Sequence, residues 1–170
     1  MTPSPQTIPP ALVPQAVIDH LKLREGWRTD VYLDSLGKPT AGMGHLLSAV
    51  EKNRYPVGSQ VPLPILEGWA QSDSLKAYQA AQSQAAMLGV ASQDFINALT
   101  SVNFQLGTAW NKTFPTTWKL MLAHDWAKAA DAVKQSKWFK QTPVRVTDFQ
   151  AAMMALVNPP AGNTESSPQD

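Results

Sequence analysis

The chain has 170 residues and a mass of 18.5 kDa, enough for one domain or for two small lobes that share a core. Its 44% hydrophobic and 16% charged residues are typical of a soluble globular protein, and its net charge of +1 gives no global support for nucleic-acid binding. The absence of cysteine excludes disulfides, thiolate nucleophiles and cysteine-built metal sites. The three histidines are widely spaced, so we expect no histidine metal cluster, and the sequence gives no sign of a cofactor.

The sequence has no candidate membrane span or signal peptide. No apolar run approaches the ~18 to 20 residues that a helix needs to cross a bilayer. The chain starts Met1-Thr-Pro-Ser-Pro, without the basic start and the apolar run of a signal peptide. We therefore expect synthesis in the cytoplasm, no stable membrane insertion, and release by a separate protein if the chain acts elsewhere.

Proline marks both ends of the chain. Five of the 14 prolines lie within residues 3–14, which predicts a proline-rich extension over 1–14. Residues 159–170 are rich in proline, glycine and serine, which predicts a loose tail. A single domain is expected over 15–158.

The first elements of that domain are a helix and a hairpin. Val17, Leu21 and Glu25 recur every four residues, which predicts a helix over 15–25 that ends at Gly26. A change of period predicts strands over 31–33 and 39–43 about a turn at 35–38. The hairpin belongs to a region spanning about 27–64.

The remainder of the sequence favours helices. A proline-free stretch predicts a connecting helix over about 65–88 that ends at Gly89. A helical lobe is expected over about 92–158, with the helix 15–25 packed on it. Its helices are expected from a cap at Ser92 or Asp94 through Phe104, over 125–138 and over 147–157. The fold class is therefore α+β, mainly α, with two lobes.

Candidate chemistry lies in the stretch from Leu23 to Leu47. Glu25 is expected at the end of its helix and on the apolar face, where burial and the helix dipole favour the protonated form that a general acid needs. Asp34 lies where the first strand enters the turn, and Thr40 follows on the returning strand. Two carboxyl groups in different environments meet the requirement for glycoside hydrolysis. Each of the three residues also has a simpler interpretation that remains open. Glu25 can be a solvated charge, Asp34 a residue that forms the turn, and Thr40 an ordinary strand residue.

The spacing of Glu25, Asp34 and Thr40, followed by Gly42-Met43-Gly44-His45-Leu46-Leu47, resembles the phage-type lysozymes. The second half of the chain adds two further stretches of resemblance. Asn103-Phe104-Gln105-Leu106-Gly107 is similar to the family's central helix, and Ser136-Lys137-Trp138-Phe139-Lys140-Gln141-Thr142-Pro143-Val144-Arg145 to its C-terminal signature. These stretches occur in the family's order and span most of the domain.

The resemblance implies a muramidase that hydrolyses the β-1,4 bond between N-acetylmuramic acid and N-acetylglucosamine in peptidoglycan. Glu25 would be the general acid, Asp34 would position or activate the attacking water, and Thr40 would help to hold that water. Arg145 would pair with Glu25 and orient it. The family is inverting, so the two carboxyl groups are expected ~6.5 to 9.5 Å apart.

The resemblance also assigns substrate contacts and structural residues. Four residues match or adjoin positions that line the sugar-binding cleft: Leu46, Phe104, Gln105 and Thr117. For Leu46 and Phe104 a core position remains an equal alternative. His45 is expected to form a structural ion pair with Asp73, and Trp126 and Trp138 are expected in the core.

The sequence also departs from the family pattern. Ala132 replaces an asparagine that contacts sugar, and Pro39 removes an amide donor just before Thr40. The span from His45 to the central helix is shorter than the family's.

We expect a monomeric phage endolysin that binds no nucleic acid and is made in the host cytoplasm. A holin would release it to the periplasm and the cell wall. Two alternatives remain. A lytic transglycosylase needs only the acid, so the retained Asp34 and Thr40 argue against it. A secreted antibacterial effector or a virion-associated wall-degrading module would use the same fold.

Overall fold

The computed structural model describes residues 12–157, so most of the expected 1–14 extension and the whole 159–170 tail lie outside the described residues. The chain forms two compact units that meet in the sequence between Tyr78 and Gln79. The expected packing of the first helix on the helical lobe stays a prediction.

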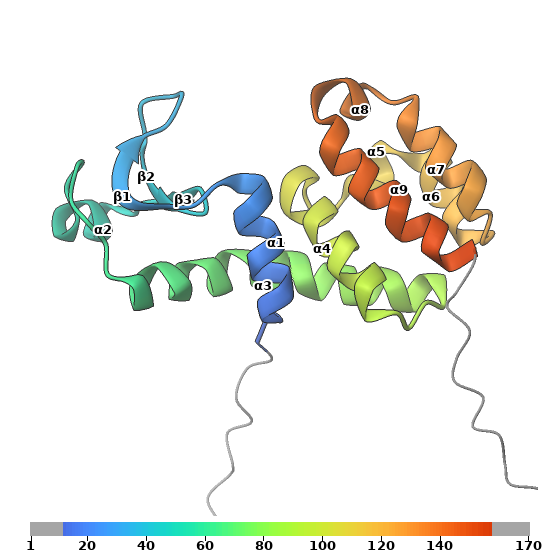
Figure 1. Ribbon diagram of the computed structural model, residues 1–170, viewed down its shortest axis with the longest axis horizontal. Helices are drawn as coiled ribbons and strands as arrows, with labels where there is room; N and C mark the ends of the chain where they lie inside the picture. The colour runs from blue at the N-terminus through green and yellow to red at the C-terminus, as the bar shows by residue number, and fades with distance from the viewer. Residues whose placement is uncertain (1–11, 158–170) are drawn as a thin grey trace, which may run out of the picture. The chain divides into compact units, whose positions relative to one another are not determined.

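Figure 1 shows the first unit in blue to green. It contains α1 (Gln15–Glu25), β1 (Arg28–Leu33), β2 (Pro39–Gly42), β3 (His45–Leu46), α2 (Ala49–Arg54) and the first part of α3 (Leu63–Leu88). The second unit contains the rest of α3, α4 (Gln93–Leu106), α5 (Trp110–Thr113), α6 (Pro115–Leu122), α7 (Trp126–Lys134), α8 (Lys137–Gln141) and α9 (Pro143–Val157). The predicted α+β, mainly helical fold is confirmed.

The first unit is built on an antiparallel sheet in the order β1-β2-β3. Tyr32 pairs with Thr40, which in turn pairs with Leu46 on the third strand. The outer edge of β1 is covered by residues 58–61, whose backbone bonds to Thr29 and Val31 satisfy an edge that would otherwise be open. Five buried side chains form the core beneath the sheet: Val31, Ala41, Leu47, Val61 and Leu66.

The second unit has a larger, aromatic-rich core. Trp110 lies near its middle and makes edge-to-face contacts with Trp118 and Phe149, at centroid distances of 5.8 and 5.7 Å. Trp126 and Trp138 are buried in the same cluster, as the sequence predicts. Helices α4, α7 and α9 supply most of the remaining core residues.

Several helix boundaries differ from the prediction for clear physical reasons. The helix expected over 125–138 ends at Lys134, because the Ser136 side chain caps a new helix by accepting the Phe139 amide. α9 begins at Pro143 instead of 147, a position that suits proline because the first helical residue needs no amide donor. α6 likewise begins at Pro115, a start signal that the prediction missed, together with α2, β3 and α5.

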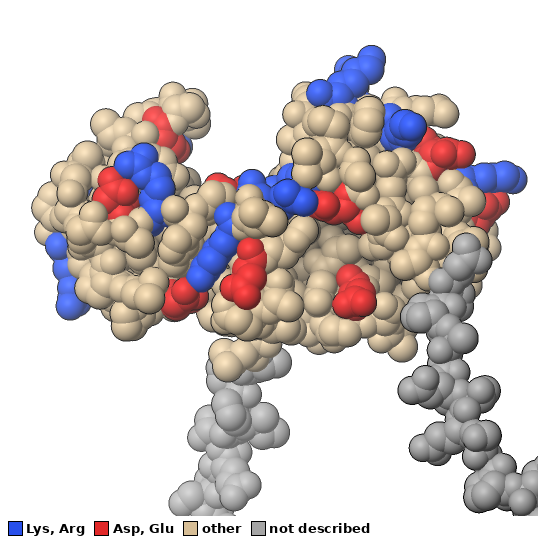
Figure 2. All heavy atoms as spheres, in the orientation of Figure 1, with Lys and Arg blue, Asp and Glu red and all other residues tan. Residues whose placement is uncertain are grey.

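The visible surface of the molecule is of mixed charge. Figure 2 shows lysines and arginines interspersed with carboxylates on the visible face, in keeping with the near-zero net charge. Among the helices within residues 12–157, none combines the length and the apolar character needed to span a bilayer.

One buried polar network joins α3, α4 and α5 inside the second unit. Gln84 and Asn103 exchange two amide hydrogen bonds of 2.9 and 2.8 Å, and the Trp110 indole donates to Gln84 Oε1 at 3.0 Å. Asn103 also donates to the Leu99 carbonyl at 2.8 Å. Because each amide is buried and partnered, the network holds three helices in one register.

Replacing Gln84 by methionine should destabilise the fold. Methionine has about the same volume, but it cannot form the hydrogen bonds that Gln84 makes with the Asn103 amide and the Trp110 indole N–H. Each buried group that loses its partner costs about 1 to 3 kcal/mol. Urea unfolding should therefore show a free energy of unfolding lower by about 2 kcal/mol or more. Gln82→Met on the exposed side of the same helix is the matched control. Equal stability of the two variants would contradict this role for the network.

Candidate active site

Glu25 is the last residue of α1. The helix buries Val17, Ile18 and Leu21 and ends at Gly26, whose φ of 85° suits glycine and whose amide donates to the Lys22 carbonyl at 2.9 Å. Glu25 itself is exposed, so the partial burial expected from its place in the helical repeat is wrong. The repeat fails at its last residue because the helix stops there and buries nothing beyond Leu21.

The start of α1 is fixed by a side chain of α3. Gln71 accepts the Val13 amide at 3.0 Å and donates to the Val13 carbonyl at 2.9 Å, while the Val13 side chain is buried. This pair of bonds anchors the chain just before the helix that carries Glu25.

Asp34 builds the turn in which it lies. Its Oδ1 accepts the backbone amides of Leu36 and Lys38 at 2.9 and 2.8 Å, and its own amide donates to the Lys38 carbonyl at 2.9 Å. The turn also uses Gly37 at a φ of 74°. Asp34 is therefore the turn former that the simpler reading expects, yet both side-chain bonds go to one oxygen. Within the described part of the chain, its second oxygen, Oδ2, is left for a water or a substrate.

Thr40 is tied to the same turn. Its hydroxyl donates to the Lys38 carbonyl at 2.9 Å, the carbonyl that also accepts the Asp34 amide. Thr40 is buried, and its only hydroxyl proton is used in this bond, so its oxygen acts toward a further group as an acceptor. The Lys38 backbone thus fixes Asp34 and Thr40 relative to each other.

Leu46 is a direct neighbour of Thr40 on the sheet. The two residues are Cα partners across β2 and β3, so their side chains lie on one face. Leu46 is 53% exposed, which supports the surface-contact reading over the core reading. The first unit thus contains Glu25, Asp34, Thr40 and Leu46.

The other predicted residues belong to the second unit. Gln105 accepts the Trp138 indole N–H at 2.9 Å and donates to the Thr142 hydroxyl at 3.1 Å, so its amide is oriented by α8 and the residue that follows. Phe104 is half-buried. Arg145 donates to the carbonyl and the hydroxyl of Ser101 at 3.1 and 3.0 Å. Its pairing with Glu25 stays a prediction.

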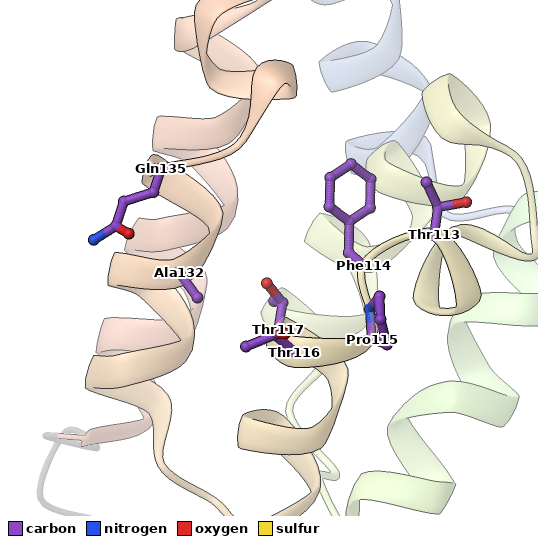
Figure 3. A pocket seen from close by; sticks show the side chains of 7 residues that line it. All are labelled: Thr113, Phe114, Pro115, Thr116, Thr117, Ala132 and Gln135. Atoms are coloured by element: carbon purple, nitrogen blue, oxygen red, sulfur yellow. The ribbon is translucent and has the colours of Figure 1, made fainter.

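Thr117 is buried and lines an open pocket of about 310 Å³ in the second unit. The remaining lining residues are Thr113, Phe114, Pro115, Thr116, Ala132 and Gln135. Figure 3 shows the Ala132 side chain directed toward Thr117. Alanine is short, so Ala132 leaves room in the pocket. The loss of the sugar contact that the family's asparagine makes stays a prediction.

His45 is held between two carboxylates, one more than the sequence predicts. Its Nδ1 lies 2.7 Å from Asp73 Oδ2, which confirms the expected pair, and its Nε2 lies 3.1 Å from Glu51 Oε2. The ring also stacks on Trp69 at 4.2 Å. The Glu51 contact was missed, although Ser48 and Glu51 have the spacing of a capping box, which they form at the start of α2.

These contacts shift two pKa values in opposite directions. Burial alone lowers the pKa of His45, but the hydrogen bonds to Asp73 and Glu51 raise it, and the net direction is upward from 6.5. Burial raises the pKa of Glu51, but the bonds from Ser48 and His45 lower it, and the net direction is downward from 4.5. The imidazolium form satisfies both carboxylates, whereas a neutral ring donates to only one.

No cluster of three or more histidine and carboxylate side chains within residues 12–157 is arranged to hold a metal ion.

A sequence model of the family "Phage lysozyme" matches residues 22–152, well over half of the chain. The chain belongs to the phage lysozyme family. Among its relatives are two probable T4-type lysozymes of Dictyostelium discoideum, each 28% identical. The first alignment covers 76% of this chain and 88% of the relative, and the second covers 75% and 86%. The chain is accordingly a lysozyme-like hydrolase of the cell wall.

Two further relatives are larger proteins. The pre-baseplate central spike protein Gp5 of Enterobacteria phage T4 is 26% identical, over 89% of this chain and 28% of the spike protein. The peptidoglycan hydrolase gp36 of Pseudomonas phage phiKMV is 26% identical, over 81% of this chain and 15% of gp36. In both, the match is a part of a longer chain.

The stability of this phage lysozyme should depend on pH through His45. A raised folded-state pKa contributes stability that is fully present below about 6.5 and is lost as pH rises through the folded value. Glu51, with a lowered pKa, contributes stability that is lost as pH falls below about 4.5. The free energies of unfolding in urea of wild type and His45→Gln should differ most between about pH 4.5 and pH 6.5. They should converge as the pH rises above the folded-state pKa of His45. A difference that stays constant from mildly acidic to alkaline pH would contradict the role of the imidazolium.

Proposed function

We propose that the chain is a muramidase that cleaves the β-1,4 bond between N-acetylmuramic acid and N-acetylglucosamine with inversion. The observation that carries the proposal is the Lys38 backbone, which joins the turn of Asp34 to the hydroxyl of Thr40. This linkage leaves Asp34 Oδ2 and the Thr40 oxygen as two acceptors on one rigid turn. A water that donates one proton to each has its lone pair free to attack.

The proposed reaction balances with these groups alone. Glu25 donates its proton to the glycosidic oxygen as the bond from that oxygen to the anomeric carbon breaks. The water attacks the anomeric carbon from the opposite face and gives a proton to Asp34, while Thr40 holds the water in place. Neither carboxyl group forms a covalent bond to the sugar, so the configuration inverts.

We assign the sugar contacts as the sequence predicts, to Leu46, Phe104, Gln105 and Thr117. The exposure of Leu46 beside Thr40 and the pocket at Thr117 support two of these assignments. The neutral lining of that pocket, with threonine hydroxyls beside an aromatic ring, suits the hydroxyl groups and the apolar face of a pyranose. Arg145 is assigned to orient Glu25, following the family pattern.

The biological role that we propose is that of an endolysin made in the host cytoplasm and released to the wall by a holin. The endolysin role is supported by two relatives that match over 86% or more of their own length and are named probable T4-type lysozymes. A monomeric state is part of this proposal. A virion-associated wall-degrading module is the second candidate, because most of this chain also matches a part of a phage spike protein.

Glu25→Gln should abolish hydrolysis without unfolding the protein, since an amide of the same shape has no acidic proton to give. We expect activity on purified Gram-negative peptidoglycan to fall by about 100-fold or more. Mass spectrometry of the muropeptides should show reducing muramic ends from wild type, and proton NMR of the first-formed product should show the α-anomer. Anhydro ends would identify a transglycosylase, and near-wild-type activity of the variant would remove Glu25 as the acid.

The release route is tested by expression in bacteria. Wild type produced in the cytoplasm should leave cells intact until a holin is co-expressed, after which the culture should lyse within minutes. Glu25→Gln with the holin is the control for membrane damage alone. Lysis by wild type without a holin would contradict dependence on a separate release protein.

A further inference from the structure

Lys22 is held by two groups at the last turn of α1. Its Nζ lies 2.5 Å from Glu67 Oε1 on α3 and 4.0 Å from the centroid of the Trp27 ring. The Lys22 side chain is only 20% exposed. Its backbone carbonyl accepts the Gly26 amide that closes the helix, so one residue contributes both main chain and side chain to the end of α1.

Trp27 connects this helix end with the sheet. A β-carbon added to Gly42 would lie 3.6 Å from Trp27 Cζ3, so the indole packs closely against β2. Gly42 lies in the same strand as Thr40. The ammonium of Lys22 therefore fixes a ring that lies between the turn carrying Glu25 and the strand carrying Thr40.

The position of Lys22 also has an electrostatic consequence. Lys22 precedes Glu25 by three residues, a spacing at which opposite charges on a helix attract each other. An ammonium beside Glu25 would favour its ionised form, which has no proton to donate. In the structure, Glu67 and Trp27 bind this ammonium.

We propose that Lys22 is a positioning residue: its ammonium, bound by Glu67 and Trp27, fixes the turn that carries Glu25 and is withheld from the Glu25 carboxyl group. The proposal rests on the proposed role of Glu25 as the general acid. It gives Glu67 a part in the reaction, although Glu67 lies on another helix.

Other charges near this turn are the same in every variant considered below. On α1 the nearest are Arg24 and Asp19, and on β1 Arg28 is bound to Asp30 at 2.7 Å. The family pattern adds Arg145. Because none of these is altered, a difference between variants reports on Lys22 and Glu67.

The test is a double-mutant cycle of wild type, Lys22→Met, Glu67→Gln and the double variant. In Glu67→Gln the ammonium of Lys22 is held less firmly and can approach Glu25. We therefore expect the alkaline limb of the kcat profile to move down by a few tenths of a pH unit, with KM little changed. The double variant lacks the Lys22 ammonium, so the alkaline limb of its kcat profile should return toward the wild-type position. Lys22→Arg keeps both contacts and should preserve kcat.

Lys128→Met is the matched control, because Lys128 is 75% exposed and pairs with Asp125 in the second unit. A carbon NMR titration of the Glu25 carboxyl group in the same proteins measures the electrostatic effect independently of any activity assay. An unmoved limb and an unmoved titration in Glu67→Gln would overturn the proposal. A second outcome combines two results. If the Glu25 titration shifts in Glu67→Gln but the Glu25→Gln variant stays active, the electrostatic effect is supported and the role of Glu25 as the acid is overturned.

Discussion

The candidate site depends on one constraint, the closed turn from Asp34 to Lys38. Backbone bonds close this turn around a glycine at positive φ, and the Asp34 carboxylate adds two side-chain bonds to the same turn. The same bonds fix the direction of the carboxylate, so Oδ2 has a defined position relative to Thr40. A residue chosen for turn geometry thereby becomes an oriented acceptor, and the simple and the functional readings of Asp34 are compatible.

The first part of α3 supplies the other fixed points of the first unit. Glu67 holds Lys22, Gln71 holds the backbone of Val13, and Asp73 holds His45. These partners come from the end of α1, from its start and from β3. One helix thus fixes both ends of the helix that carries Glu25 and the strand that carries Leu46. Polar contacts suit this task because their geometry is directional, whereas apolar packing tolerates sliding.

The sequence predicts the elements whose signals are local. Helix α1 and its end at Gly26 follow from the apolar repeat and from glycine, and the hairpin follows from the change of period. Two features do not follow from such signals. The exposure of Glu25 depends on where α1 stops burying residues. The contact of Glu51 with His45 depends on how side chains from separate elements meet. The short α5 and the two-residue β3 lack the length over which periodicity is measurable. Asp34, Thr40 and Leu46 are brought together by strand register, which the hairpin spacing only partly determines.

The exposure of Glu25 bears on how the proposed enzyme would begin a second cycle. After one cleavage the acid has lost its proton and Asp34 has gained one, so both must be reset. Exposed Glu25 and half-exposed Asp34 can each exchange protons directly with bulk water. No internal relay of side chains is then required between the two carboxyl groups. Recovery of the acid would then depend on the solvent alone and not on neighbouring side chains.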